Sequence, residues 1–117
     1  MDNSTTISEL KDLVEQFVKE RDWEQFHSPK NLSMAIAVEA AELMDLFKWH
    51  TPEESTQRMS EGPSPAEEEI ADVVIYCLAF ANRNNIDLTT AIRNKIALNA
   101  QKYPADHVRG SAAKYTG

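Results

Sequence analysis

The sequence predicts an all-α protein. Apolar residues recur at helical spacing in four segments, and residues that favour helix starts or stops flank these segments. No segment alternates apolar and polar residues as a half-buried strand does. We therefore expect a four-helix bundle in a single domain that covers residues 1–117. Residues 1–5 and 105–117 lack apolar periodicity and are expected to be irregular.

The first two predicted helices have clear starts. Thr6, with a glutamate three residues later, fits a capping box, and apolar residues then recur at helical spacing for about four turns. The second helix begins with Ser28 as its N-cap and Pro29 at its first helical position. It is expected to extend to about Trp49.

The third and fourth predicted helices follow a charged connection, residues 51–63, which has room for a short helical piece. Ser64, again with a glutamate three residues later, fits a second capping box at the start of the third helix. This helix is expected to end at residues 82–85. Asp87 caps the fourth helix, which ends near Tyr103 because a proline follows.

Composition and charge narrow the class of protein. The net charge of −7 argues against a nucleic-acid polymer as the main partner, because such partners are bound by clustered Lys and Arg. No charge-free run reaches the roughly 18 to 20 residues that a membrane helix needs. The single cysteine, Cys77, cannot form an internal disulfide, which favours a soluble cytoplasmic protein. The second helix is apolar nearly all round, which predicts an oligomer.

The most informative residues are acids inside the two most apolar helices. Glu39 and Glu42 are three positions apart on the second helix, so they share one helix face. Glu69 and Asp72 repeat this spacing on the third helix. If these two helices pack antiparallel, the four carboxylates can face one another.

A cluster of four facing carboxylates is tolerated only if its members are protonated, paired with cations or bound to metal, since like charges repel and burial adds a further cost. Few basic residues lie on these two helices, so a bound metal is the simplest partner. An all-oxygen ligand set suits Mg²⁺, with Mn²⁺ as a second candidate. Neither pair ends in the histidine that di-iron bundles use. The alternative is that each pair belongs to a solvated helix face, as most charged residues do.

Several runs resemble the MazG-like all-α nucleoside triphosphate pyrophosphohydrolases, most closely the dCTP pyrophosphatase subfamily. The acid pairs lie within two of them, Glu39–Leu43 and Glu68–Val73, and Arg21–His27 is a third. Lys102–Pro104 and Lys114–Thr116 near the end of the chain are similar to that subfamily as well. The resemblance covers nearly the whole chain, roughly from Leu10 to Thr116.

The resemblance implies an assembly and a set of site residues. It implies a homotetramer, a dimer of dimers, with active sites between subunits. It implies that the four acids hold Mg²⁺, that the nucleotide base sits in an aromatic pocket and that two further residues hold the triphosphate. The base-pocket positions are Trp23, Trp49 and Tyr76, and the triphosphate positions are Lys95 and Asn99, one turn apart on the fourth helix.

The activity that this resemblance implies is Mg²⁺-dependent hydrolysis of a nucleoside triphosphate, dCTP or a modified dCTP, to the monophosphate and pyrophosphate. Water activated by the metal would attack the α-phosphorus, with Glu42 positioning or deprotonating it and Glu39 as the alternative. The implied role is to clear unwanted nucleotides from the nucleotide pool. Val14 stands where animal relatives carry a base-pocket histidine, which puts a strict dCTP preference in doubt.

Two other functions remain open from the sequence. The nearer one is the same chemistry on dUTP or another non-standard nucleotide. The farther one is a non-catalytic helical oligomerisation module whose inward acids pair with basic residues of a partner.

Overall fold

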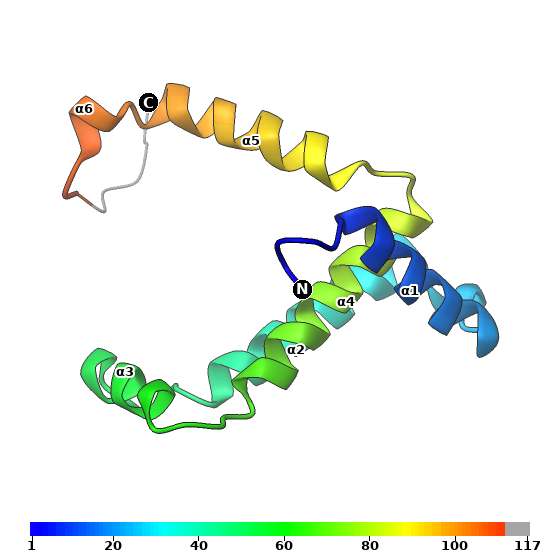
Figure 1. Ribbon diagram of the computed structural model, residues 1–117, viewed down its shortest axis with the longest axis horizontal. Coiled ribbons are helices and arrows are strands. Elements are labelled where there is room, and N and C mark those ends of the chain that lie inside the picture. Colours follow the sequence, from blue (N-terminus) through cyan, green and yellow to red (C-terminus); the bar gives the residue numbers. More distant parts are fainter. Residues whose placement is uncertain (112–117) are drawn as a thin grey trace. The chain divides into compact units, whose positions relative to one another are not determined.

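The computed structural model describes residues 1–111, and within them every regular element is a helix (Figure 1). The all-α class predicted from the sequence is confirmed for this part of the chain. The Lys114–Thr116 run lies outside the described residues. The elements are α1 (Ile7–Glu20), a short 3-10 helix η1 (Glu24–Phe26), α2 (Pro29–Asp45), α3 (Pro52–Ser60), α4 (Ala66–Arg83), α5 (Leu88–Lys102) and α6 (Ala105–Val108).

The helices belong to two compact units. The first unit, Met1–Asn85, contains α1 to α4, and the second begins at Ile86 and contains α5 and α6. The four-helix bundle and the single domain over residues 1–117 stay predictions. Within the second unit, Ala105–Val108 form a short helix where the sequence predicts irregular structure.

Three helix starts are as the sequence predicts, because a side-chain oxygen accepts a hydrogen bond from a free backbone N–H in each. The Thr6 hydroxyl accepts from the N–H of Glu9 at 3.1 Å, but the Glu9 carboxylate accepts from the Thr6 hydroxyl at 3.3 Å and not from the Thr6 backbone N–H, so only half of the expected capping box forms. The Ser28 hydroxyl accepts from the N–H of Asn31 at 3.1 Å, and Pro29 follows at the first helical position. The Asp87 carboxylate accepts from the third N–H of α5 at 2.9 Å.

The capping box expected at Ser64 is wrong. Pro65 already has helical backbone angles and is the N-cap of α4, so Ser64 lies one residue too early. The Ser64 hydroxyl accepts instead from the N–H of Ala66 at 3.1 Å. The reciprocal capping box is at the start of α3, where Thr51 and Glu54 each accept from the other's backbone N–H. The bond from the Thr51 backbone N–H lowers the pKa of the Glu54 carboxyl.

Helix α2 is shorter than the sequence predicts. It ends at Asp45, whereas the apolar pattern favoured an end near Trp49. The N–H groups of Leu46 and Phe47 bond to carbonyls three residues back, at 3.2 and 3.0 Å, so the chain tightens into turns there. Apolar residues in a turn look the same in sequence as apolar residues in a helix, which explains the error.

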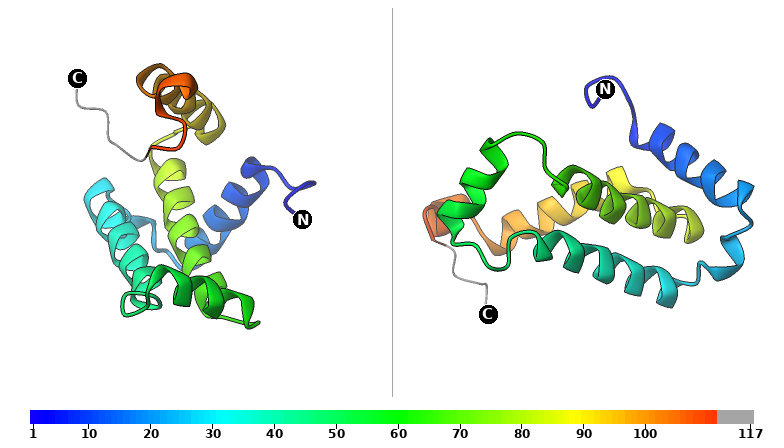
Figure 2. Two further views of the ribbon diagram at one scale, coloured as in Figure 1. Left: turned by 90° about the vertical axis from the view of Figure 1, so that its left-hand side faces the viewer. Right: turned by 90° about the horizontal axis from the view of Figure 1, so that it is seen from below.

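Helices α2 and α4 lie side by side and antiparallel, and α1 packs against α4 (Figure 2). At the end of α4 the Asn82 amide nitrogen donates to the Lys11 carbonyl at 2.9 Å, which ties α4 to α1. The buried apolar residues come from all three helices. They are Val14, Val18, Leu32, Ala66, Leu78, Ala79 and Ala81.

This core is small for the apolar content of the chain, because many large apolar side chains remain exposed. Leu13 on α1, Met44 on α2 and Ile96 on α5 are 63%, 59% and 62% exposed. Such surface favours contact with another protein chain. Among the described helices, none has the length and apolar character required to cross a membrane.

Candidate functional site

Four carboxylates meet between α2 and α4, and we call them the acidic cluster: Glu39 and Glu42 on α2, and Glu69 and Asp72 on α4. One oxygen from each of Glu39, Glu69 and Asp72 lies within 4.8 Å of the other two. Glu42 lies within hydrogen-bonding reach of both Glu39 and Glu69. The antiparallel packing of the two helices thus turns both acid pairs toward one point.

Two oxygens of the acidic cluster are shielded from solvent without a partner. Glu39 Oε2 and Glu69 Oε2 are buried, and neither has a hydrogen-bond partner within the part of the chain that is described. No lysine or arginine among residues 1–111 forms an ion pair with any member of the cluster. Since a buried, unpartnered carboxylate oxygen is costly, the arrangement leaves a place for a positively charged ligand.

The local environment favours the protonated forms of Glu39 and Glu69. Partial burial raises the pKa of both carboxyls, and a hydrogen bond with Glu42 adds to this effect. The charges of Glu42 and Asp72 raise both pKa values further. A divalent cation would reverse this balance, because it stabilises the ionised carboxylates. The all-oxygen donor set fits a hard cation such as Mg²⁺.

These raised pKa values predict a specific dependence of stability on pH. Without metal, the unfolded chain releases the Glu39 and Glu69 protons at lower pH than the folded chain does, so stability falls as the pH rises through the folded pKa values. In Glu69→Gln this loss should be smaller, because glutamine stays neutral. Thermal unfolding in EDTA between about pH 5 and pH 8 measures the difference. A stability gap between the two proteins that stays constant with pH would show that the Glu69 carboxyl is not the source of the dependence.

A second feature is a hollow of about 420 Å³ at the start of α2, which we call the aromatic hollow. Its walls come from the loop after α1, from α2 and from α4. The lining residues are Trp23, Phe26, His27, Asn31, Leu32, Ala35 and Tyr76. The Trp23, Phe26 and Tyr76 rings among them provide flat faces for a planar ligand.

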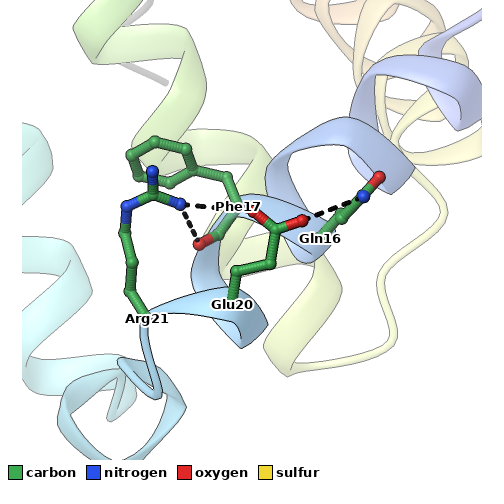
Figure 3. A network of polar contacts seen from close by, with 4 residues as sticks. All are labelled: Gln16, Phe17, Glu20 and Arg21. Carbon is green, nitrogen blue, oxygen red and sulfur yellow. Dashed lines mark hydrogen bonds and ion pairs between the residues drawn. The ribbon is translucent and has the colours of Figure 1, made fainter.

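The position of Trp23 follows from the way α1 ends. Asp22 takes a left-handed backbone conformation, with φ of 54°, and the Trp23 N–H bonds back to the Val18 carbonyl at 3.1 Å. The Trp23 ring then meets the Phe17 ring edge to face at 5.7 Å. The Arg21 guanidinium lies 3.7 Å from the centre of that Phe17 ring and donates to the Phe17 carbonyl at 3.0 Å (Figure 3).

The aromatic hollow and the acidic cluster are neighbours along the same pair of helices. Tyr76 lies four residues after Asp72 on α4, and Ala35 lies four residues before Glu39 on α2. Four residues of helix cover about 6 Å, so each helix places the two features one turn apart. A ligand with an aromatic ring and a phosphate chain can therefore reach both.

Other residues singled out in the sequence lie elsewhere. Trp49 does not line the aromatic hollow; it follows the end of α2, is 87% exposed and has the Lys48 Nζ 5.6 Å from its ring centre. Lys95 and Asn99 are exposed on α5, in the second unit. Val14 is buried and lines a separate hollow of about 240 Å³ with His27 and Asn82.

The sequence analysis missed His27 and Asn31. The only sequence signal for His27 was its position at the end of the Arg21–His27 run. The only signal for Asn31 was that it precedes Glu39 by eight residues, which places both on one helix face. The structure places both in the wall of the aromatic hollow. Partial burial, together with the charge of Arg83, lowers the pKa of His27.

Known proteins resemble this chain in sequence and in fold. The chain matches the MazG-like family over residues 34–117. It is 42% identical to dCTP pyrophosphatase 1 of Rattus norvegicus over 113 residues and to that of Homo sapiens over 116 residues. Each alignment includes 95% of this chain and 66% of the relative, so the chain spans just under two thirds of the length of these relatives.

A solved structure gives the same result for the fold. The crystal structure of a pyrophosphatase from Archaeoglobus fulgidus superimposes with a TM-score of 0.78 at 37% sequence identity. The match covers 83% of this chain and 91% of that one. The helical architecture and the family match agree, and the chain belongs to the MazG-like family.

Proposed function

We propose that this protein hydrolyses a nucleoside triphosphate, dCTP or a modified dCTP, to the monophosphate and pyrophosphate, and that it depends on Mg²⁺. The observation that carries the proposal is the pair of buried, unpartnered oxygens in the acidic cluster, one helical turn from an aromatic hollow. The names of the relatives support it, since two are dCTP pyrophosphatases and one is a pyrophosphatase.

In this proposal the four acids of the cluster hold the metal. Mg²⁺, or Mn²⁺ in its place, supplies charge neutralisation at the phosphate oxygens and a lowered pKa for water when bound. Glu39 and Glu69 are half-buried and each keeps one oxygen shielded, which suits them to hold a cation in fixed geometry. The residues that would hold the metal are Glu39, Glu42, Glu69 and Asp72.

Glu42 is our candidate for the residue that orients the attacking water and accepts its proton. Its side chain is exposed, whereas Glu39 and Glu69 are half-buried, so Glu42 can reach a water molecule at the open side of the cluster. Glu39 is the alternative. The attack would fall on the α-phosphorus, and pyrophosphate would leave without a covalent enzyme intermediate.

The substrate's base would bind in the aromatic hollow against Trp23 and Tyr76. Stacking on an aromatic ring stabilises a bound base by about 1 to 3 kcal/mol. The deoxyribose would then lie between the aromatic hollow and the acidic cluster, which are one helical turn apart. Lys95 and Asn99, exposed on α5, are proposed to contact the triphosphate, and Trp49 is proposed to complete the base pocket.

The position of Trp49 favours a site shared between subunits. Trp23 precedes α2 and Trp49 follows it, and a helix of 17 residues is about 25 Å long. One base cannot touch both tryptophans of the same chain, so a Trp49 that contacts the base comes from another copy. We therefore propose a homotetramer, a dimer of dimers, with active sites between subunits.

Exposed apolar surface in the first unit supports that assembly. A groove of about 400 Å³ between α1 and α4 is lined by apolar side chains alone. A second copy of the chain is the occupant we propose for it. The groove residues are Leu10, Leu13, Val14, Phe17, Ala71, Val74, Ile75 and Leu78.

We take residues 1–117 as one pyrophosphohydrolase domain that acts on nucleotides in the cytoplasm. The net charge of −7 is unsuited to a nucleic-acid polymer, whereas a metal between acids and phosphates permits a nucleotide. Clearing unwanted triphosphates from the nucleotide pool is the role that this activity would serve.

A panel of triphosphates tests the proposal. Pyrophosphate release should require Mg²⁺, should stop in EDTA and should be fastest with dCTP or 5-methyl-dCTP. Fastest release with dUTP would keep the chemistry and change the substrate. Absence of pyrophosphate release with every triphosphate, in a protein that is folded and oligomeric, would refute the enzyme and favour the oligomerisation module.

A further inference from the structure

The polar groups of the aromatic hollow differ in what they can recognise. The Trp23 indole N–H only donates hydrogen bonds, while the Tyr76 hydroxyl and the neutral imidazole of His27 can donate or accept. Cytosine and uracil share the O2 carbonyl, which any of these three groups can bind as a donor. They differ at position 4, where cytosine carries an amino group and uracil a carbonyl. Tyr76 and His27 can meet either substituent at position 4, and a donor such as the Trp23 N–H would favour the uracil carbonyl there, so none of the three selects cytosine by its polarity.

Asn31 is different, because its orientation is fixed. Its amide nitrogen donates to the Phe26 carbonyl at 3.0 Å. A carbonyl cannot accept from the amide oxygen, so this bond identifies which end of the amide is the nitrogen. The amide oxygen has no hydrogen-bond partner among residues 1–111. Asn31 therefore offers the hollow an acceptor and keeps its donor occupied.

The backbone holds Asn31 in place as well. Its N–H donates to the N-cap Ser28 at 3.1 Å, so the residue sits in the first turn of α2. The same helix carries Glu39 two turns later, on the same face. A base in the hollow and a phosphate at the acidic cluster would both be positioned by one rigid helix.

We infer that Asn31 determines base specificity: its amide oxygen accepts a hydrogen bond from the exocyclic amino group of the base. An acceptor in this position favours cytosine, because uracil would place its own carbonyl oxygen against it. This inference rests on the proposed function, since it assumes that the aromatic hollow holds the nucleotide base. In this inference the Asn31 amide oxygen distinguishes an amino group from a carbonyl group at position 4 of the base.

Binding of dCMP and dUMP to the full-length protein tests the inference without requiring turnover. The wild type should bind dCMP tighter than dUMP by roughly tenfold to a hundredfold, because the bound uracil would set its own carbonyl oxygen against the Asn31 amide oxygen and leave both acceptors unpaired. Asn31→Ala should bring this ratio close to one, mainly by weakening dCMP. Asn31→Asp should keep the preference for dCMP, since it keeps an acceptor. Isothermal titration calorimetry gives both dissociation constants.

Gln25→Ala is the matched control. The Gln25 amide nitrogen donates to the Asp22 carbonyl at 3.0 Å, so it ties the same loop, but Gln25 does not line the hollow. Loosening this loop should weaken dCMP and dUMP binding in parallel and leave their ratio unchanged. A change of the ratio in Asn31→Ala but not in Gln25→Ala separates base recognition from loop support.

Two results would overturn the inference: a wild type that binds dCMP and dUMP equally, or an Asn31→Ala variant that keeps the wild-type ratio. Either result can occur in a protein that releases pyrophosphate from triphosphates, and the proposed function would then stand. Conversely, selective dCMP binding that depends on Asn31, in a protein that hydrolyses no triphosphate, would support the base site and refute the enzyme.

Discussion

Replacing Glu69 by Gln is expected to lower turnover by more than about 100-fold. Loss of a residue that only supports a metal ligand already costs up to about 100-fold, and Glu69 is proposed to be a ligand itself. The amide removes one negative charge from the acidic cluster and one shielded oxygen that lacks a partner. Mg²⁺ should bind more weakly, and less of the phosphate charge should be neutralised. Steady-state pyrophosphate release at saturating Mg²⁺ measures the loss in kcat/KM.

The fold of the Glu69→Gln protein should survive. In EDTA at neutral pH its thermal unfolding temperature should be at least that of the wild type, because a like-charge contact has been removed. Glu67→Gln is the matched control, since Glu67 lies in the same first turn of α4, is exposed and is outside the cluster. Full Mg²⁺-dependent turnover in Glu69→Gln would remove this residue from the metal site.

Replacing Leu13 by Asp is expected to break the oligomer and abolish turnover. Leu13 is 63% exposed and lines the apolar groove between α1 and α4, so its own chain does not bury it. If a second copy covers the groove, the new carboxylate is buried without a partner, at a cost of several kcal/mol per copy. Light scattering after size-exclusion chromatography should show a smaller assembly, and pyrophosphate release should fall with it.

Ser8→Asp, which places a charge on the other side of α1, is the control for Leu13→Asp. Ser8 is exposed, and five residues of helix turn the chain by about 140°, so Ser8→Asp places its charge away from the groove. That variant should keep the mass and the activity of the wild type. A Leu13→Asp protein that keeps the wild-type mass would show that the groove lies outside any interface.

The errors in predicting the helices have a common origin. The Ser64 motif and the apolar run after Asp45 both look helical over a few residues. In the structure, Pro65 has helical backbone angles, so the N-cap of α4 is Pro65 and not Ser64. At the end of α2, hydrogen bonds to carbonyls three residues back replace the helical bonds to carbonyls four residues back. Capping and termination depend on backbone angles at single residues, and a sequence pattern specifies such angles only loosely.

The base pocket was predictable only in part. Trp23 and Tyr76 were expected to share a pocket with Trp49, and the structure brings together only the first two within one chain. His27 and Asn31 gave no distinctive signal, because a single histidine or asparagine near a helix start is common and usually structural. Their positions depend on the turn at Asp22 and on the packing of α2 against α4.

The sequence by itself determined the all-α class and the spacing of the acids within each helix. Glu39 with Glu42, and Glu69 with Asp72, share a helix face because backbone geometry over one turn is local and fixed. That the two faces meet was decided only by the tertiary structure, since residues about 30 positions apart in sequence come together through the packing of whole helices. The same packing buries the two oxygens that lack a partner, and no local pattern encodes that burial.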